Sequence, residues 1–306
     1  MRTAPILMVG LAACGSVDNK QTDAAMPDMK SIDAAIDTPA GPACDVTKPF
    51  GSPVALAGGV NTAGDERFGY LSGDELTVYF SDVDTDRDIW YATRTSPTAG
   101  FGTAMKLPGV NTTTNEEHPG ITTDGLILVS DHSFGTTADI GIVTRPNVAQ
   151  DFGALASLAG VNQTNTNETD GFISRDGLTV VFGSDRTGAQ YRLFSSTRTS
   201  TTAAFGTPAE LVGLDDAAAT DSGGVLSDDK LEILFYSNRA GGQGGVDIWR
   251  ATRASASDNF GAPTDVTELN SSNIEFVSWL SPDRCRVMFA SDRLGSYDLF
   301  MATRPQ

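Results

Sequence analysis

The sequence predicts an all-β fold, a five-bladed β-propeller with four antiparallel strands per blade, and three observations lead to this prediction. A Phe-Gly pair recurs at intervals of 51 to 55 residues, at Phe50, Phe101, Phe152, Phe205 and Phe260. Each copy contains segments in which apolar and polar residues alternate between turns rich in Gly, Asp and Asn, which is typical of strands. A repeat of roughly 50 residues with about four such strands has the length of one propeller blade.

The strands follow one another in the same order in every copy. In the first copy we expect them near residues 66–72, 76–80, 88–94 and 104–108. The chain enters with one strand of the outermost type, at 53–57, and leaves after the first three strands of the last copy. The N-terminal strand is therefore predicted to complete the C-terminal blade, which closes the ring without a leftover strand.

Composition limits the classes of function. The 306 residues are 40% hydrophobic, which is enough to bury a substantial core, and the formal net charge is −18. Binding to nucleic acid or adsorption to an anionic membrane needs clustered Lys and Arg, so neither is expected. Three cysteines are too few for a disulfide scaffold, and no pair has the spacing of a zinc site.

The N-terminus is predicted to be a targeting segment. Residues 1–14 place Arg2 before a short apolar run that ends in Leu-Ala-Ala-Cys, which is the layout of a secretory signal. The last four residues resemble the bacterial lipobox, and this resemblance implies an acylated Cys14 as a lipid anchor. Because Gly15 is not the Asp that retains such proteins at the inner membrane, the outer membrane is favoured. The alternative is an ordinary cleaved signal.

The rest of the chain divides into two parts. Residues 15–43 are rich in Ala, Asp and Pro and contain no aromatic residue, so a disordered tether is expected there. Residues 44–306 form the predicted propeller. Cys285 stands where the other copies have a leucine at the start of the second strand, and Cys44 shortly precedes the N-terminal strand of the same blade. We expect a disulfide between them in an oxidising compartment; the alternative is a buried free thiol at Cys285.

The full repeat resembles the WD-like propeller repeat of the TolB type. The shared elements are FG-x-P, L-x-G-V-N, S-x-D-G, V-x-F-x-S-D-R, D-I-W and a final T-R, and they recur five times over residues 50–306. The resemblance implies a propeller with partners among envelope proteins. TolB-type propellers usually have six blades, whereas this sequence has five repeats. The expectation is therefore either a smaller ring or a sixth blade that the sequence pattern does not reveal.

Two sets of charged residues recur in every copy and are expected to form ion pairs within each blade. The first set lies in the turn before the second strand: Asp74, Asp124, Asp176, Asp229 and Asp283. The second set ends the third strand: Arg94, Arg145, Arg198, Arg253 and Arg304. A Ser or Thr two residues before each aspartate predicts a side-chain-capped turn.

A third recurring set is an acid at the start of each innermost strand, for which two interpretations compete. The residues are Glu66, Glu116, Glu168, Asp221 and Glu275. They could form a ring of carboxylates at the channel mouth that binds a cation or a basic ligand. Alternatively, they pair with loop arginines of the same face, although the second copy has His132 there. The arginines are Arg87, Arg186, Arg239 and Arg293.

Two weaker metal patterns occur in the first two copies. Asp82, Asp84, Asp86 and Asp88 alternate in one loop, as carboxylates do in calcium loops. The loop lacks the turn glycine and the distal bidentate glutamate, so a solvated hairpin is the alternative. Both histidines fall in the second copy: His118 follows two glutamates and His132 follows Asp131, on one predicted face. Exposed surface histidines are the competing interpretation.

Taken together, these features favour a non-enzymatic envelope lipoprotein, monomeric, whose propeller face binds a protein, peptide or glycan. No cofactor is expected apart from the weak calcium pattern. The alternative is a five-bladed glycoside hydrolase that uses inner-strand carboxylates. Glycosidic cleavage needs two carboxyl groups in different environments, whereas the five recurring acids look equivalent. No nucleophile elbow or phosphate loop is present in the sequence.

Overall fold

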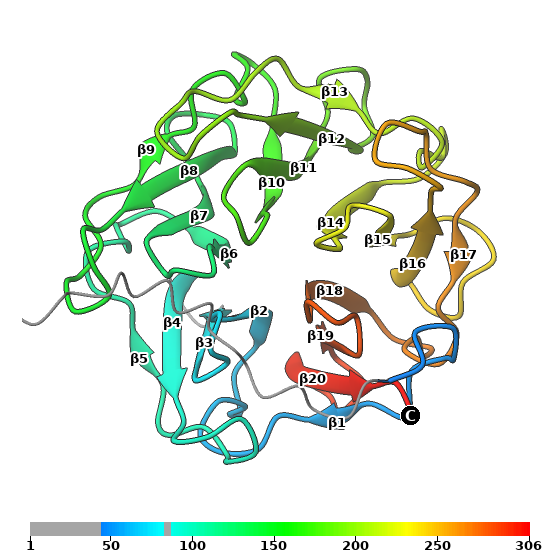
Figure 1. Cartoon of the computed structure of the whole chain (residues 1–306), viewed down its shortest axis with the longest axis horizontal. Coiled ribbons are helices and arrows are strands. Elements are labelled where there is room, and N and C mark those ends of the chain that lie inside the picture. Colours follow the sequence, from blue (N-terminus) through cyan, green and yellow to red (C-terminus); the bar gives the residue numbers. More distant parts are fainter. Residues whose placement is uncertain (1–43, 83–86) are drawn as a thin grey trace, which may run out of the picture. The chain divides into compact units, whose positions relative to one another are not determined.

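The computed structural model describes residues 44–82 and 87–306, and these residues form five four-stranded antiparallel sheets. The sheets stand around a central axis as the blades of a propeller (Figure 1), which confirms the predicted fold class. The innermost strands are β2 (Glu66–Leu71), β6 (Glu116–Ile121), β10 (Glu168–Ile173), β14 (Asp221–Leu226) and β18 (Glu275–Leu280). The second strands are β3 (Thr77–Asp82), β7 (Ile127–His132), β11 (Thr179–Ser184), β15 (Glu232–Ser237) and β19 (Arg286–Ser291).

The two outer strands of each blade differ in length. The third strands have six residues: β4 (Asp88–Thr93), β8 (Asp139–Thr144), β12 (Arg192–Thr197), β16 (Asp247–Thr252) and β20 (Asp298–Thr303). The outermost strands have two: β5 (Met105–Lys106), β9 (Ala156–Ser157), β13 (Ala209–Glu210), β17 (Thr264–Asp265) and β1 (Val54–Ala55). Short outer strands limit the edge that each blade exposes to another chain.

The two ends of the described chain meet in the fifth blade. β1 pairs antiparallel with β20, with Val54 opposite Met301 and Ala55 opposite Phe300. The blade therefore has the order β1-β20-β19-β18, and the predicted closure by the N-terminal strand is confirmed. Residues 44–82 and 87–306 contain five blades and no sixth.

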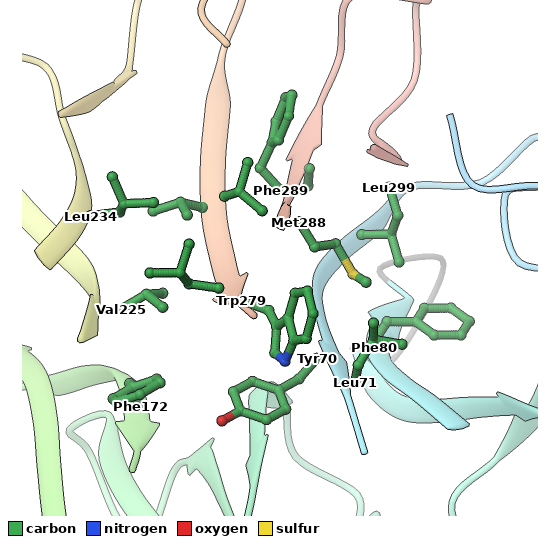
Figure 2. Packing of buried hydrophobic residues seen from close by; sticks show 14 of the residues in the cluster. Tyr70, Leu71, Phe80, Phe172, Val225, Leu234, Trp279, Met288, Phe289 and Leu299 are labelled. Atoms are coloured by element: carbon green, nitrogen blue, oxygen red, sulfur yellow. The ribbon is translucent and has the colours of Figure 1, made fainter. Parts of the chain in front are cut away.

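The core lies within and between the blades. Phe80, Phe182, Phe235 and Phe289 occupy the same position of the second strand in four blades and are at most 1% exposed, because period-two alternation directs that position into the sheet packing. Between blades 5 and 1, Trp279 and Met288 lie close to Tyr70 and Leu71 (Figure 2). Gly69 allows this approach, since a Cβ there would lie 2.6 Å from the Met288 sulfur.

The asparagine of the recurring Gly-Val-Asn turn binds the backbone of the third strand of its blade. In blade 1, Asn111 Oδ1 accepts the Ile89 N–H at 2.8 Å, and its Nδ2 donates to the Ile89 carbonyl at 2.9 Å. The same two-bond contact holds Asn61 to Leu299, Asn162 to Ile140, and Asn270 to Ile248. A carboxylate cannot donate, and in blade 3 Asp215 instead forms an ion pair with Arg192 at 3.0 Å.

The recurring Asp and Arg residues act separately, so the predicted ion pairs between them are wrong. Asp74 caps its own turn, accepting from the Ser72 hydroxyl at 2.6 Å and the Leu76 N–H at 3.0 Å. Arg94 extends past it: Nε donates to the Glu75 carbonyl at 2.7 Å, and the guanidinium lies 4.5 Å from the centroid of the Phe101 ring. The same stacking joins Arg145 to Phe152, Arg198 to Phe205, Arg253 to Phe260, and Arg304 to Phe50.

The Arg-Phe contact explains why each repeat opens with Phe-Gly. An arginine that ends one third strand stacks on the phenylalanine that opens the next repeat, a cation–π contact that is strongest when desolvated. Arg304 and Phe50 make the final contact of the ring, 4.0 Å apart, although they lie at opposite ends of the propeller sequence.

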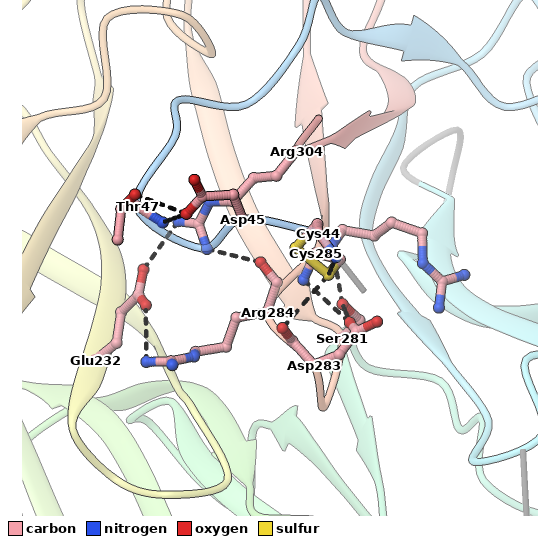
Figure 3. The surroundings of a disulfide bond; sticks show 10 residues. Cys44, Asp45, Thr47, Glu232, Ser281, Asp283, Arg284, Cys285 and Arg304 are labelled. Atoms are coloured by element: carbon pink, nitrogen blue, oxygen red, sulfur yellow. Dashed lines mark hydrogen bonds and ion pairs between the residues drawn. A yellow bond between two sulfur atoms is a disulfide. The ribbon is translucent and has the colours of Figure 1, made fainter. Parts of the chain in front are cut away.

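A disulfide joins the same two ends. Cys44 and Cys285 are bonded, with their Cα atoms 5.6 Å apart, beside Arg284 and Arg304 (Figure 3). The bond ties the segment that precedes β1 to the turn that precedes β19. The predicted signal sequence, Cys14 and tether fall outside the described residues. The described part of the chain holds no helix that is long and apolar enough to cross a membrane.

Candidate functional site

The five recurring acids are fully buried. Glu66, Glu116, Glu168, Asp221 and Glu275 each begin an innermost strand and are 0% exposed. All five accept hydrogen bonds from the loop that precedes their own strand. Glu116 illustrates the pattern, since Thr112 donates its N–H at 2.9 Å and its hydroxyl at 2.6 Å.

Three of the loop arginines pair with these acids, as the second interpretation expected. Arg186 contacts Glu168 at 3.0 Å, Arg239 contacts Asp221 at 2.5 Å, and Arg293 contacts Glu275 at 3.0 Å. In blade 2, His132 Nδ1 lies 2.7 Å from Glu116, while Arg87 pairs with Glu117 at 3.1 Å. The recurring acids of blades 2 to 5 are thus buried carboxylates satisfied within their own blades, as burial requires. The Arg87–Glu117 pair differs, since it joins the β3–β4 loop of blade 1 to β6 of blade 2.

This geometry does not support a ring of ligand-binding carboxylates at the channel mouth. The acid oxygens are turned into the loops of their own blades and away from solvent. Glu66 has no arginine within ion-pair distance among the described residues, and burial raises its pKa against the opposing hydrogen bonds from Thr62. The carboxylates hold the loops to the innermost strands.

The alternating acidic loop is described only in part. Asp84 and Asp86 lie outside the described residues, so the predicted calcium site stays a prediction. Asp82 and Asp88 face each other at the ends of β3 and β4. Asp88 is 5% exposed and forms an ion pair with Lys106, which neutralises one of the expected ligands.

A second layer of residues does not follow the repeat and lies deeper in the channel. The third residue of the innermost strand is Phe68, His118, Asp170 and Gly223 in blades 1 to 4, and all four have positive φ, from 54° to 63°. In each of these blades the pairing of the first two strands shifts register at this point, as at a β-bulge. A non-glycine residue held in this conformation is costly and is often found at functional sites.

His118 and Asp170 meet Asp131 of β7 in one cluster. His118 Nδ1 lies 2.8 Å from Asp131 Oδ2, and Nε2 forms an ion pair with Asp170 Oδ1. The Asp170 carboxylate also accepts from the Ser222 hydroxyl, and Asp131 accepts the backbone N–H groups of Asp170 and Gly171 at 2.9 and 3.2 Å. Blades 2, 3 and 4 thus meet in one cluster, in which Asp131 and Asp170 contact the imidazole and Ser222 contacts Asp170.

The cluster sets the charge of its members. Burial disfavours the charged form of His118, but the carboxylates of Asp170 and Asp131 outweigh it and raise the His118 pKa to about 10. Burial also opposes ionisation of Asp170, yet His118, Ser222 and Tyr236 lower its pKa to about 2. Burial raises the pKa of Asp131 despite its contact with His118. His118 is therefore an imidazolium at neutral pH.

The cluster forms part of a cavity of about 380 Å³ that opens at one face of the propeller. The volume lies in the range of small-ligand sites. Tyr191 and Tyr236 add aromatic surface, and Glu117 lines the same space beside Arg87. A second cavity of about 30 Å³ also borders His118 and Asp170, and its other lining residues include Phe68, Phe172 and Val277. The remaining polar residues around the larger cavity include Asn115, His132, Ser133, Thr169, Thr220 and Ser222.

Among the described residues, the strongest metal-ligand geometry is this same cluster. One ligand atom each from His118, Asp131 and Asp170 lie within 4.8 Å of one another. Nitrogen and carboxylate donors suit several divalent metals. A metal would first have to displace one of the two N–H protons of the His118 imidazolium, each of which faces a different carboxylate, since only neutral imidazole is a ligand.

We expect the His118 ring to stay protonated at pH 8. Its pKa of about 10 in the folded protein lies above the ordinary value of 6.5. The ion pairs therefore contribute their full stability below pH 6.5 and lose it as the pH rises through about 10. NMR titration of the imidazole carbon shifts from pH 5 to 10.5 measures this directly. In Asp170→Asn the midpoint should fall by at least one unit; a wild-type midpoint near 6.5 would contradict the described contacts.

The sequence interpretation found part of this cluster. It placed His118 and Asp131 on one face but missed Asp170, Ser222 and Tyr236, which belong to blades 3 and 4. The sequence feature that could have revealed the cluster is a residue type that differs from the one at the same position of the other repeats. At the position of Asp131, the other four blades carry Ser81, Gly183, Tyr236 and Ala290. The propeller repeat therefore does not require an acid at this position.

Comparisons with known proteins support the fold. No protein-family model matches the chain, and no curated protein matches it. A TolB candidate from Agrobacterium tumefaciens has 17% identity and a TM-score of 0.50, over 75% of this chain and 71% of that one.

Two glycoside hydrolases have the same propeller architecture. A thermostable family-43 enzyme shares 11% identity at a TM-score of 0.56, over 79% of this chain and 89% of its own. The catalytic domain of a GH62 α-L-arabinofuranosidase from Coprinopsis cinerea shares 14% at a TM-score of 0.55, over 84% and 96%. Identities this low show a common propeller fold alone.

Proposed function

We propose that this protein is a non-enzymatic binding propeller of the cell envelope, whose cavity across blades 2 to 4 receives part of a protein, peptide or glycan partner. The observation that carries the proposal is the concentration of non-repeating polar side chains around one open cavity of about 380 Å³. Residues that recur in every blade are explained by the fold. His118, Asp131, Asp170 and Tyr236 are not, and they converge where a ligand has access.

The arrangement of the cluster favours binding over glycoside hydrolysis. The pKa values of Asp131 and Asp170 are shifted in opposite directions, as those of a catalytic acid and base often are. A glycosidase, however, holds its two carboxyl groups on either side of the scissile bond. Here the imidazolium of His118 occupies the space between them, with an ion pair to each.

We further propose that the propeller is exported and anchored to the outer membrane through an acylated Cys14, with residues 15–43 as a tether. The disulfide between Cys44 and Cys285 suits an oxidising compartment outside the cytosol. The net charge of −18 supports a partner that is neutral or basic.

The test is a pull-down from envelope extract together with a glycan screen, comparing wild type with Tyr191→Ala. Tyr191 lines the cavity and immediately precedes β12. Tyr297 immediately precedes β20 in blade 5 but does not line the cavity, so Tyr297→Ala is the matched control. Because Tyr191→Ala removes a large aromatic contact, we expect its affinity for the partner to fall by about tenfold or more. The affinity of the Tyr297→Ala control should be unchanged.

Two results would overturn the proposal. One is a partner that binds Tyr191→Ala and wild type equally, which would move recognition away from the cavity. The other is turnover of a glycan that disappears in Asp131→Asn while the variant keeps its melting temperature, which would make the protein a hydrolase.

A further inference from the structure

The cavity has more negative than positive charge, and its excess is not neutralised by the described residues. At its inner end, Asp131 and Asp170 share the single positive charge of His118. At the wall, Arg87 neutralises Glu117 through Oε2 only. The other oxygen, Glu117 Oε1, is buried and accepts no hydrogen bond from the described residues. An unpaired carboxylate oxygen in this position is unfavourable until a donor arrives.

Two tyrosines in the cavity wall respond to the same excess charge. Burial raises the pKa of Tyr191, and Asp185, Asp170, Asp131 and Glu168 raise it further. Burial also raises the pKa of Tyr236, with Asp170 and Asp131 adding to the shift. Both tyrosines line the cavity together with Glu117, Asp131 and Asp170, and the negative charge of these carboxylates would attract a cation.

We propose that the cavity binds a protonated primary amine, the side chain of a lysine in a basic segment of the partner. This rests on the proposed binding function and specifies its ligand. Three carboxylates, Glu117, Asp131 and Asp170, line one cavity, and an ammonium offers three donors on a compact head. Tyr191 and Tyr236 line the same cavity, and aromatic rings suit both the alkyl stem and the charge of a lysine. The net charge of −18 draws basic segments toward the propeller.

Isothermal titration of the full chain with acetyl-Gly-Lys-Gly-amide tests this without any mutation. The comparison peptide carries Nε-acetyl-lysine, which has the same stem without the charge. At pH 7 in EDTA-containing buffer, we expect the acetylated peptide to bind at least tenfold more weakly. Raising the salt from low concentration to 0.5 M should weaken binding of the lysine peptide severalfold, because salt screens the attraction between the ammonium and the carboxylates.

A charge-matched pair of variants assigns the binding to the cavity. Glu117→Gln should lower the affinity for the lysine peptide by about tenfold and leave the affinity for the acetylated peptide unchanged. Asp258→Asn, the same charge change at an exposed position outside the cavity, should leave both peptides unchanged. Glucosamine is the second ligand, since an amino sugar presents the same ammonium on a different scaffold.

The outcomes separate this inference from the proposed function. Equal binding of both peptides, or glucosamine bound more tightly than the lysine peptide, would overturn the inference. Suppose that an envelope partner no longer binds Tyr191→Ala, but that neither acetylation of its lysines nor Glu117→Gln changes its binding. In that case the lysine assignment fails and the binding function stands. If no partner depends on Tyr191, both fail.

Discussion

Replacing Cys44 with serine is expected to lower the free energy of unfolding by up to about 5 kcal/mol. The disulfide that it removes connects residues separated by 241 positions, and a cross-link that closes so long a loop strongly restricts the unfolded chain. Measured stabilisation often falls below this loop-entropy value, so 2–5 kcal/mol is the expected range. Urea denaturation, followed by the fluorescence of buried tryptophans, measures it.

The control separates the bond from the side chains. Wild type treated with reductant should unfold at the same urea concentration as untreated Cys44→Ser, because both lack the bond and leave Cys285 as a buried thiol. Identical midpoints for oxidised and reduced wild type would show that the bond contributes nothing. Peptide mass mapping under non-reducing conditions then distinguishes an absent bond from an ineffective one.

Replacing Glu232 with threonine is expected to cost about 3–5 kcal/mol, because it leaves buried positive charge without a partner. Glu232 begins β15 and is 0% exposed. Three arginines surround it, of which Arg284 and Arg304 are seen in Figure 3. Arg250 lies 2.7 Å away, Arg304 3.1 Å and Arg284 3.6 Å. Threonine is the residue at this position of blades 1 and 3, so the substitution suits the strand. The midpoint of urea unfolding reports the loss.

A second substitution tests the electrostatic cause. Arg250→Met places in blade 4 the residue that blade 5 carries at the equivalent position, Met301. Combined with Glu232→Thr, it removes one of the like charges and should recover at least 1 kcal/mol of the loss. If the double variant is no more stable than Glu232→Thr alone, packing rather than charge explains the effect.

These two predictions concern the same region of the molecule. Arg304 joins Glu232 at 3.1 Å, stacks on Phe50, and donates to the Arg284 carbonyl at 2.7 Å beside the disulfide. Blades 4 and 5 and both ends of the described chain are therefore tied together by one arginine. Its four repeat counterparts stack on a phenylalanine in the same way, but none of them reaches a fully buried carboxylate.

The fold was predictable from the sequence because its determinants are local and repeated. Alternation of apolar residues defines each strand, and the Asp and Asn turns mark its ends. The strand count at the two ends required β1 to pair with β20. The partners of the recurring arginines were not predictable in the same way, since stacking of Arg94 on Phe101 depends on how far the side chain extends past Asp74.

By itself the sequence determined a ring of five blades closed by its own ends, because each blade repeats the same short-range pattern. Only the tertiary structure decided which acids support the blades and which line the cavity. The five recurring acids proved to be buried supports of their own blades, whereas Asp131 and Asp170 meet at His118 from different blades. That convergence depends on the bulged backbone at His118 and Asp170 and on the curvature of the ring. Neither can be predicted from a local sequence pattern.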